Sequence, residues 1–262
     1  MSKLFDLENK IVLITGGGTH LGKAMSEAVA EFGGTLILAS RDENRTTEHA
    51  NKLKSLYNIE AIGMKLDFTD DTSIKHLLSA IIEKYGKIDV LINNSFFAKA
   101  GKIEEQSYED FMEGIHGTIG GTFNMTKHTL GIMLKQKHGN IINISSMYGV
   151  VSPNPNLYEG TNNMPNPANY GAGKAAVIQF TKYIACNYAK HNIRCNCIVP
   201  GTFPNPGVQE DTDFIKNLCD KNPMGRIGVP NDLKGITVLL SSDASSYMTG
   251  QAIHVDGGWT AW

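Results

Sequence analysis

Tyr170 and Lys174 stand four residues apart in the segment Tyr-Gly-Ala-Gly-Lys. On a helix, this spacing puts both side chains on one face. A free tyrosine titrates near ~10, and a neighbouring positive charge lowers the pKa of its phenol. A phenol adjusted in this way can exchange a proton with a substrate oxygen near neutral pH. Since an ordinary helical Tyr–Lys pair has the same spacing, the elements around the pair must decide between the two interpretations.

The composition is that of one large globular domain. The chain has 262 residues, of which 41% are hydrophobic and 19% charged, and its net charge is −2. We treat residues 1–262 as a single domain with a substantial core. The balanced charge gives no reason to expect nucleic acid or a membrane surface as a partner. No apolar run approaches the ~20 residues that span a bilayer, and the polar first ten residues do not form a signal peptide. We therefore expect a cytoplasmic protein.

The four cysteines do not form a metal-binding pattern. They are Cys186, Cys195, Cys197 and Cys219, with no Cys-x-x-Cys pair. Cys195 and Cys197 lie two apart in an apolar run, which puts them on one face of a predicted strand. We expect buried free thiols in a reducing compartment, and no metal site.

The pattern of the N-terminal region indicates a nucleotide-binding site. Residues 11–14, Ile-Val-Leu-Ile, are typical of a strand buried on both faces. A glycine-rich segment follows at 15–22, and a helical pattern continues to Phe32. Glycines let the backbone approach phosphates, and the helix N-terminus offers free N–H groups. A plain tight turn is the alternative. The cofactor-binding candidates of this segment are Gly16, Thr19, His20, Leu21 and Gly22.

The second strand, residues 35–39, ends at Ser40 and Arg41. The ribose of the adenosine would lie at this strand end, where an acidic residue binds a 2′-hydroxyl and a basic one pairs with a 2′-phosphate. Because Asp42 comes only after Arg41, we predict NADP(H) as the cofactor, with NAD(H) as the alternative. The competing interpretation is that Arg41 is a solvated loop residue.

Strands and helices alternate along the rest of the chain. This alternation predicts an α/β fold: a Rossmann-type, doubly wound parallel sheet of about seven strands with helices on both faces. Ligands then lie at the carboxyl ends of the strands. Asp67 and the pair Asn93–Asn94 fall at such ends. Gly114, Gly117, Gly120 and Gly121 crowd the long helical stretch 107–135, so we expect close packing there.

The ordered set of motifs resembles the short-chain dehydrogenase/reductase family over nearly the whole chain, and most of all its gluconate 5-dehydrogenase and 3-oxoacyl-carrier-protein reductase branches. The motifs are the turn 15–22, Asp67, Asn93–Asn94, Ser146, Tyr170 with Lys174, Pro200–Gly201, and Val-Asp-Gly-Gly at 255–258. Any one of them is weak evidence, whereas the set in this order is specific.

The resemblance implies a role for each matching residue. Ser146 would hydrogen-bond the substrate oxygen, Tyr170 would exchange the proton, and Lys174 would lower the pKa of Tyr170 and bind the nicotinamide ribose. The cofactor carries the hydride. Asp67 would meet the adenine and Asn93 the ribose region of the cofactor. Pro200 and Gly201 would line the nicotinamide pocket.

Three positions depart from the family pattern. His20 replaces the middle glycine of the phosphate turn, where a side chain either crowds the pyrophosphate or donates a hydrogen bond to it. Thr118 stands where the family has an asparagine that holds a proton-relay water, and a hydroxyl offers fewer donors than an amide. Phe96 follows Asn93–Asn94 where the family has a small residue. We assign Phe96 to the wall of the substrate pocket, with a core position as the alternative.

An insertion separates Ser146 from Tyr170, which lie 24 positions apart. Its prolines and asparagines predict a turn-rich loop at 147–168 beside the active site. Loops of this length often have a function, so we assign Tyr158 and Glu159 to substrate binding. In the family, the segment corresponding to about 202–222 closes over the substrate, which predicts a lid.

We therefore predict an NADP(H)-dependent oxidoreductase that interconverts a secondary alcohol and a ketone on a sugar-like or polyol substrate. One alternative is a reductase of 3-oxoacyl or small hydrophobic ketones. A second, of another class, is a non-catalytic nucleotide sensor or scaffold. The tail carries Trp259 and Trp262, which either pack into a subunit interface or fold back on their own chain. The resemblance implies a homotetramer, with a dimer as the alternative.

Overall fold

The apolar runs of the sequence become buried strands of one sheet. The computed structural model describes residues 3–261. All pairs of neighbouring strands are parallel, in the order β3-β2-β1-β4-β5-β6-β7. The predicted doubly wound α/β fold is confirmed. The strands are β1 (Ile11–Thr15), β2 (Thr35–Ser40), β3 (Ala61–Lys65), β4 (Val90–Asn93), β5 (Gly139–Ile144), β6 (Ile193–Pro200) and β7 (Ala252–Val255).

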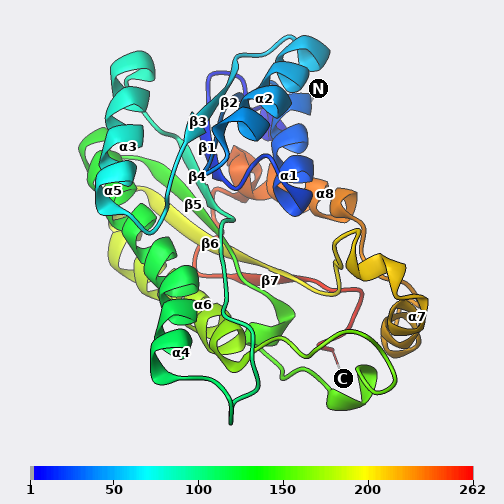
Figure 1. The fold of residues 1–262 in the computed structure, drawn as a ribbon. Helices are drawn as coiled ribbons and strands as arrows, with labels where there is room; N and C mark the ends of the chain where they lie inside the picture. The colour runs from blue at the N-terminus through cyan, green and yellow to red at the C-terminus, as the bar shows by residue number, and fades with distance from the viewer. Residues whose placement is uncertain (1–2, 262) are drawn as a thin grey trace.

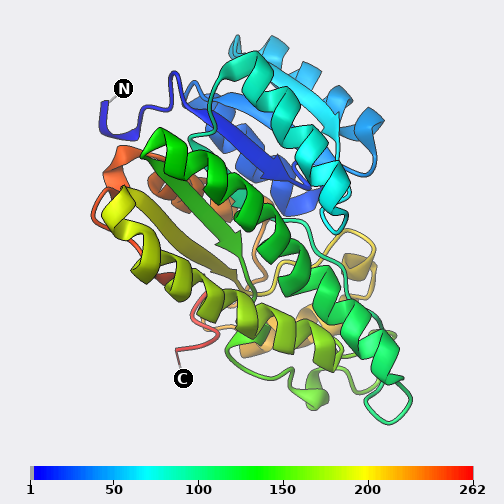
Figure 2. The same ribbon diagram turned by 90° about the vertical axis from the view of Figure 1, so that its left-hand side faces the viewer.

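Helices cover both faces of the sheet. The α-helices are α1 (His20–Glu31), α2 (Glu43–Tyr57), α3 (Asp71–Tyr85), α4 (Tyr108–Ile115), α5 (Gly121–Gln136), α6 (Ala168–Tyr188), α7 (Thr212–Lys221) and α8 (Lys234–Ser241). Helices α1, α2 and α8 lie on one face and α3 to α6 on the other (Figure 1). Figure 2 shows α5 and α6 side by side over the second face. Each face therefore has its own apolar core. Within residues 3–261 no helix is both long and apolar enough to cross a membrane.

The winding of the chain reverses between β1 and β4, which are neighbours in the sheet. Such a reversal opens a crevice at the carboxyl ends of the strands. The two strand ends are joined there, because Thr15 Oγ1 accepts the backbone N–H groups of Asn94 at 3.0 Å and Ser95 at 2.9 Å. The glycine-rich turn and the segment after β4 are thereby fixed against each other.

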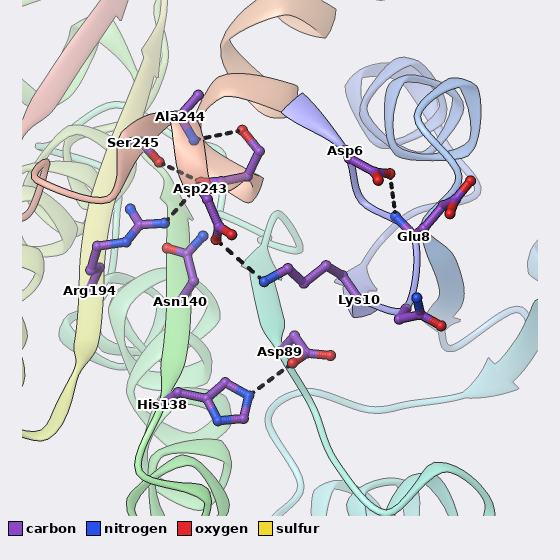
Figure 3. Close-up of polar contacts among 12 residues, drawn as sticks. Asp6, Glu8, Lys10, Asp89, His138, Asn140, Arg194, Asp243, Ala244 and Ser245 are labelled. Carbon is purple, nitrogen blue, oxygen red and sulfur yellow. Dashed lines mark hydrogen bonds and ion pairs between the residues drawn. The ribbon is translucent and has the colours of Figure 1, made fainter. Parts of the chain in front are cut away.

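Polar contacts connect the starts of the strands, on the side of the sheet opposite the crevice (Figure 3). The buried carboxylate of Asp89 accepts the N–H of Ile11 at 2.7 Å and lies 2.9 Å from both Lys87 Nζ and His138 Nε2. Burial raises the pKa of Asp89, but these contacts outweigh it and hold the pKa below its ordinary value. None of the predicted site residues belongs to this network, so its role is to fix the starts of β1, β4 and β5.

The helical stretch predicted at 107–135 is interrupted. Helix α4 leads into a π-helical turn at His116–Gly120, and α5 follows directly. A Cβ added at Gly121 would overlap the ring of Phe68, and one at Gly117 would lie 2.6 Å from the ring of Phe97. The expected close packing is therefore present. Single π turns are frequent at functional sites, and Thr118 lies in this one.

Candidate active site

A cavity of about 350 Å³ lies at the carboxyl edge of the sheet. Its walls come from the ends of β5 and β6, the start of α6, and the segments 147–168 and 202–222. Ser146, Tyr170 and Lys174 line it together with Pro200 and Gly201. The structure thus brings the three main catalytic candidates to one cavity, at the edge where ligands of this fold class bind.

The two serines after β5 make different contacts. Ser145 Oγ donates to the backbone carbonyl of Lys174 at 2.7 Å, which ties β5 to α6. Ser146 Oγ accepts the backbone N–H of Tyr148 at 3.1 Å and also hydrogen-bonds with the phenol of Tyr170. Successive residues of an extended chain face opposite ways, so only the second hydroxyl reaches the tyrosine.

The phenol of Tyr170 has a raised pKa, opposite to the predicted direction. Burial raises the pKa of Tyr170, and the hydrogen bond with Ser146 lowers it only in part. The ring of Phe96 lies against the ring of Tyr170, with centroids 5.4 Å apart. The charge of Lys174 by itself would lower this pKa, but the loss of water around the phenol favours the neutral form. In the chain by itself, Tyr170 is a neutral proton donor at neutral pH.

Lys174 is a buried cation that faces aromatic rings and a carbonyl group. Its side chain is 3% exposed, and Nζ donates to the carbonyl of Ile144 at 2.9 Å. Nζ also lies 4.4 Å from the ring centroid of Phe96 and 5.8 Å from that of Tyr170. Burial lowers the pKa of Lys174 to about 8, and Cys197 opposes this shift. At pH 7 the ammonium form still predominates.

Thr118 lies behind the cavity and is not one of its lining residues. Its hydroxyl is 1% exposed and donates within its own helix, to the carbonyls of Gly114 at 3.0 Å and Ile115 at 3.1 Å. A Cβ at Gly173 would overlap this hydroxyl, so Thr118 packs directly against α6 beside Lys174. The proton of the hydroxyl is used by the helix, which leaves Thr118 only as an acceptor for a relay water.

A second cavity, of about 300 Å³, adjoins the first and has the character of the predicted nucleotide site. The sequence-predicted candidates that line it are Gly16, Thr19, His20, Leu21, Ser40 and Arg41. Gly16 has a φ of 68°, which glycine adopts readily. A Cβ at Gly22 would overlap the carbonyl of Gly16, so Gly22 permits the tight turn without lining the cavity. This close backbone cradle fits the diphosphate of a dinucleotide.

Arg45 also lines the nucleotide cavity, next to Arg41, and was not predicted. It lies in the first turn of α2, and its Nε is 3.4 Å from Asp42 Oδ2. The available signal was the spacing: the two arginines stand four positions apart across the start of a helix. Together they place two cations at the end of β2.

Two cofactor-binding candidates make other contacts in this structure. Asn93 is buried, and its amide nitrogen donates to Thr126 Oγ1 on α5 at 3.0 Å and to Asn143 Oδ1 on β5 at 2.8 Å. Of this pair of asparagines, it is Asn94 that lines both cavities. Its Nδ2 donates to the carbonyls of Thr15 and Gly16. Asp67 does not line the nucleotide cavity, although Leu66 and Phe68 beside it do. At the end of β4, the alternation along the chain turns Asn94, and not Asn93, toward the ligand side.

The Asp67 carboxylate instead binds the turn that follows β3. It accepts the backbone N–H of Thr69 at 3.0 Å and its hydroxyl at 2.7 Å. The hydroxyl bond is the main reason that the pKa of Asp67 lies below its ordinary value, and the charge of Arg41 lowers it further. Asp67 therefore shapes the edge of the nucleotide cavity and places negative charge near Arg41.

The insertion 147–168 and the segment 202–222 pack against each other. The ring centroids of Tyr158 and Phe214 lie 5.0 Å apart, and Asn163 Nδ2 donates to Asp211 Oδ2 at 3.0 Å. Trp259 packs against the same apolar cluster, so this part of the tail folds back on its own chain. Trp262 lies outside the described residues.

Two of the three predicted substrate residues line the catalytic cavity. Tyr158 does, and its hydroxyl lies 3.1 Å from that of Tyr148. Phe96 lines both cavities, whereas Phe97 packs in the core next to Phe68. Glu159, the third, is exposed and lies outside the lining, because Tyr158 turns inward and the next residue faces solvent. The amides of Asn163, Asn166 and Asn205 complete the polar wall.

A doubly wound parallel sheet whose crevice joins a diphosphate-binding turn to a proton-donating phenol defines a nicotinamide-dependent oxidoreductase. Residues 18–260 match the family model described as enoyl-(acyl carrier protein) reductase. The chain belongs to the short-chain dehydrogenase/reductase family. This membership does not support the hypothesis of a non-catalytic sensor or scaffold.

Proteins of two kinds are among the similar relatives. The chain is 32% identical over 253 residues to a 3-oxoacyl-[acyl-carrier-protein] reductase of Thermotoga maritima, covering 96% of this chain and 98% of that protein. It is 34% identical over 266 residues to a 2-dehydro-3-deoxy-D-gluconate 5-dehydrogenase of Dickeya dadantii, covering 98% of each. The two names cover different substrates, so similarity alone leaves the substrate open between a sugar acid and an acyl carrier protein.

Solved structures superpose over nearly the whole chain. A short-chain dehydrogenase/reductase of Mycobacterium marinum has a TM-score of 0.90 at 30% identity, covering 99% of both chains. A gluconate 5-dehydrogenase of Burkholderia cenocepacia, in complex with NADP and tartrate, has a TM-score of 0.89 at 27% identity and covers 99% of this chain and 98% of that one. The chain is thus an NAD(P)-dependent oxidoreductase of this family.

Proposed function

We propose that this oxidoreductase uses NADP(H) to interconvert a secondary alcohol and a ketone on a neutral sugar-like or polyol substrate. The observation that carries the proposal is the convergence of Ser146, Tyr170 and Lys174 on one cavity that adjoins the nucleotide cavity. Four residues line both cavities, so a dinucleotide that spans them brings its reactive end to Tyr170. These shared residues are His20, Leu21, Asn94 and Phe96.

In the direction of reduction, the nicotinamide supplies the hydride when the cofactor is bound. Ser146 binds the ketone oxygen, and Tyr170 gives its proton to this oxygen as the alcohol forms. Lys174 then stabilises the phenolate that remains, because its ammonium lies on the same helix face. Solvent returns the proton to Tyr170. The raised pKa of the free phenol keeps it protonated before the step.

The polar lining of the catalytic cavity supports a hydroxylated substrate. Besides Asn94 and Tyr170, three carboxamides and two phenols line it, which can donate to and accept from hydroxyl groups. Lys174 is the single Lys or Arg among the lining residues. A wall of this kind favours neutral hydroxyls over a long acyl chain. The residues concerned are Asn163, Asn166, Asn205, Tyr148 and Tyr158.

The test is an NADPH oxidation assay with the purified chain. The panel contains keto-sugars, keto sugar acids, a 3-oxoacyl thioester and a small hydrophobic ketone. We expect the highest kcat/KM with a neutral keto-sugar. A higher value with the thioester would instead support the 3-oxoacyl alternative, which the relative of Thermotoga maritima favours. Absence of turnover with every compound, with either NADPH or NADH, would contradict the proposed activity.

Cofactor choice gives the first prediction. Arg41→Ala and Arg45→Ala should each lower the preference for NADPH over NADH by about 10-fold, since a charge-assisted hydrogen bond contributes ~1.5–3 kcal/mol. Dissociation constants of both cofactors, measured by fluorescence, report this change. The control is Lys54→Ala, because Lys54 lies on the same helix but pairs with Glu60 outside the cavity. If both arginine variants kept the natural chain's preference for NADPH over NADH, the arginines would not bind the 2′-phosphate.

The loop 147–168 gives the second prediction. Tyr158→Phe removes the hydroxyl that contacts Tyr148 at the cavity wall and should raise KM for the best substrate about 5-fold, the effect of one hydrogen bond. Glu159→Gln is the matched control and should leave KM unchanged, because Glu159 is exposed. Steady-state kinetics at saturating NADPH measure both. A larger effect of the Glu159 variant would contradict the proposed wall.

We further propose that the chain assembles as a homotetramer, or as a dimer. Large apolar side chains on α4, α5 and α6 are exposed, which supports an interface on this side of the molecule. They are Tyr108, Met112, Phe123 and Tyr183. The mass of the particle, measured by light scattering, distinguishes the two states.

A further inference from the structure

His20 has a backbone conformation that normally requires a glycine. Its φ is 34°, in the left-handed region that costs free energy for residues with a Cβ. Four other non-glycine residues among 3–261 have positive φ, and each lies in a turn or at the C-terminal end of a helix: Asn9, Asn58, Lys137 and Asn192. His20 alone among these five stands at the start of a helix, in the predicted phosphate turn. An unfavourable conformation at a functional site suggests that the side chain has a role.

The side chain of His20 reaches the segment that begins the predicted lid. Nε2 donates to the backbone carbonyl of Phe203 at 2.9 Å, across 183 residues of sequence. A carbonyl oxygen only accepts, so Nε2 carries a proton. The imidazole therefore does not project freely into the nucleotide cavity, although it lines that cavity and the catalytic cavity alike.

Phe203 is held from its other side as well. A Cβ added at Gly228 would lie 2.6 Å from the Phe203 ring, so this ring packs closely on the loop after α7. The backbone N–H of Gly228 donates to the carbonyl of Thr202 at 2.8 Å. The start of the segment 202–222 is thus fixed between the Gly228 loop and His20, while the rest of the segment covers the catalytic cavity.

We propose that His20 is a positioning residue that links the diphosphate-binding turn to the lid segment 202–222. A cofactor that orders the turn then also orders the lid over the substrate, because the imidazole joins the two. This inference rests on the proposed function only where it concerns the substrate. The contact between the turn and the lid is independent of which ketone is reduced. A glycine at position 20 would relieve the backbone and lose the link.

The test compares His20→Gly with the matched control Lys137→Gly. Both substitutions place glycine at a positive φ, so both variants should fold, but Lys137 lies at the end of α5 and lines neither cavity. Hydrogen–deuterium exchange is measured with and without NADPH. In the natural chain and the Lys137 variant, we expect NADPH to slow exchange in both 15–22 and 202–222. In the His20 variant, we expect slower exchange in 15–22 alone.

Kinetics and a conservative variant complete the experiment. His20→Gly should raise KM for the ketone about 5-fold. His20→Gln retains an N–H donor and should recover part of the lid protection. Equal NADPH-dependent protection of 202–222 in the natural chain and in His20→Gly would overturn the link. This outcome would not contradict the proposed oxidoreductase activity. Absence of any NADPH effect in the natural chain would count against both the link and the proposed function.

Discussion

Tyr170→Phe should lower kcat by about 10²- to 10⁴-fold, the range for loss of a positioned general acid. The substitution removes only the hydroxyl, so the ring still packs against Phe96. NADPH should bind with little change, because Gly16, Asn94 and the two arginines are untouched. Single-turnover kinetics at saturating NADPH measure the step itself. Fluorescence titration of NADPH confirms that the nucleotide site is intact.

The matched control is a second phenol in the same cavity. Tyr148 also lines the cavity, but its hydroxyl contacts that of Tyr158. Burial and the neighbouring phenols of Tyr158 and Tyr170 raise the pKa of Tyr148. Tyr148→Phe should therefore cost less than 10-fold in kcat, as expected for a hydroxyl that shapes the wall. If Tyr148→Phe abolished turnover and Tyr170→Phe did not, the proton donor would be Tyr148 and not Tyr170.

The parts of the molecule that local patterns encode could be predicted from the sequence. The apolar run at 11–14, followed at once by glycines and a helix, specifies a buried parallel strand and a tight turn. The alternation of strands and helices predicts a parallel sheet with right-handed crossovers, whereas the strand order is known from the structure. The helical spacing of Tyr170 and Lys174 marked the pair as a candidate, and the ordered motifs around it decided in favour of the catalytic interpretation. These features depend on neighbours in sequence, so one chain suffices to read them.

The sequence did not show side-chain direction where a strand ends. Asn93 occupies the last register position of β4 and its amide contacts β5 and α5, whereas Asn94 lines both cavities. Glu159 and Tyr158 differ in the same way within a loop. Which of two adjacent residues faces a ligand depends on packing against elements far away in sequence. The link between His20 and Phe203 is of this kind as well.

Desolvation was the other effect that the sequence could not supply. Spacing shows that Lys174 and Tyr170 share a helix face, but not that both lie where water is scarce. Burial shifts the two pKa values in opposite directions, raising that of the phenol and lowering that of the amine. Each shift favours the neutral form of its group. The buried ammonium is therefore a functional group that the fold retains at a cost in stability.

Lys174→Met should inactivate the enzyme and yet stabilise the free protein at pH 7. Activity should fall at least about 100-fold, since the charge that stabilises the phenolate is lost. The pKa of Lys174 drops from 10.5 to about 8 on folding, and a shift of this size corresponds to about 3 kcal/mol at pH 7. Loss of the hydrogen bond to the Ile144 carbonyl offsets about 1 kcal/mol. The variant should be more stable by about 2 kcal/mol.

The pH dependence tests the cause of this gain. Between pH 8 and 10.5 the unfolded natural chain binds more protons at Lys174 than the folded chain does, so folding stability at this site rises with pH. Below pH 8 the amine is protonated in both states, and the penalty is complete. The stability advantage of Lys174→Met, from urea unfolding, should therefore be largest near pH 7 and decrease by about 3 kcal/mol toward pH 10.5. The control Lys182→Met, at an exposed position of the same helix, should show no such change. A pH-independent difference between the natural chain and Lys174→Met would mean that the amine is not desolvated in the folded protein.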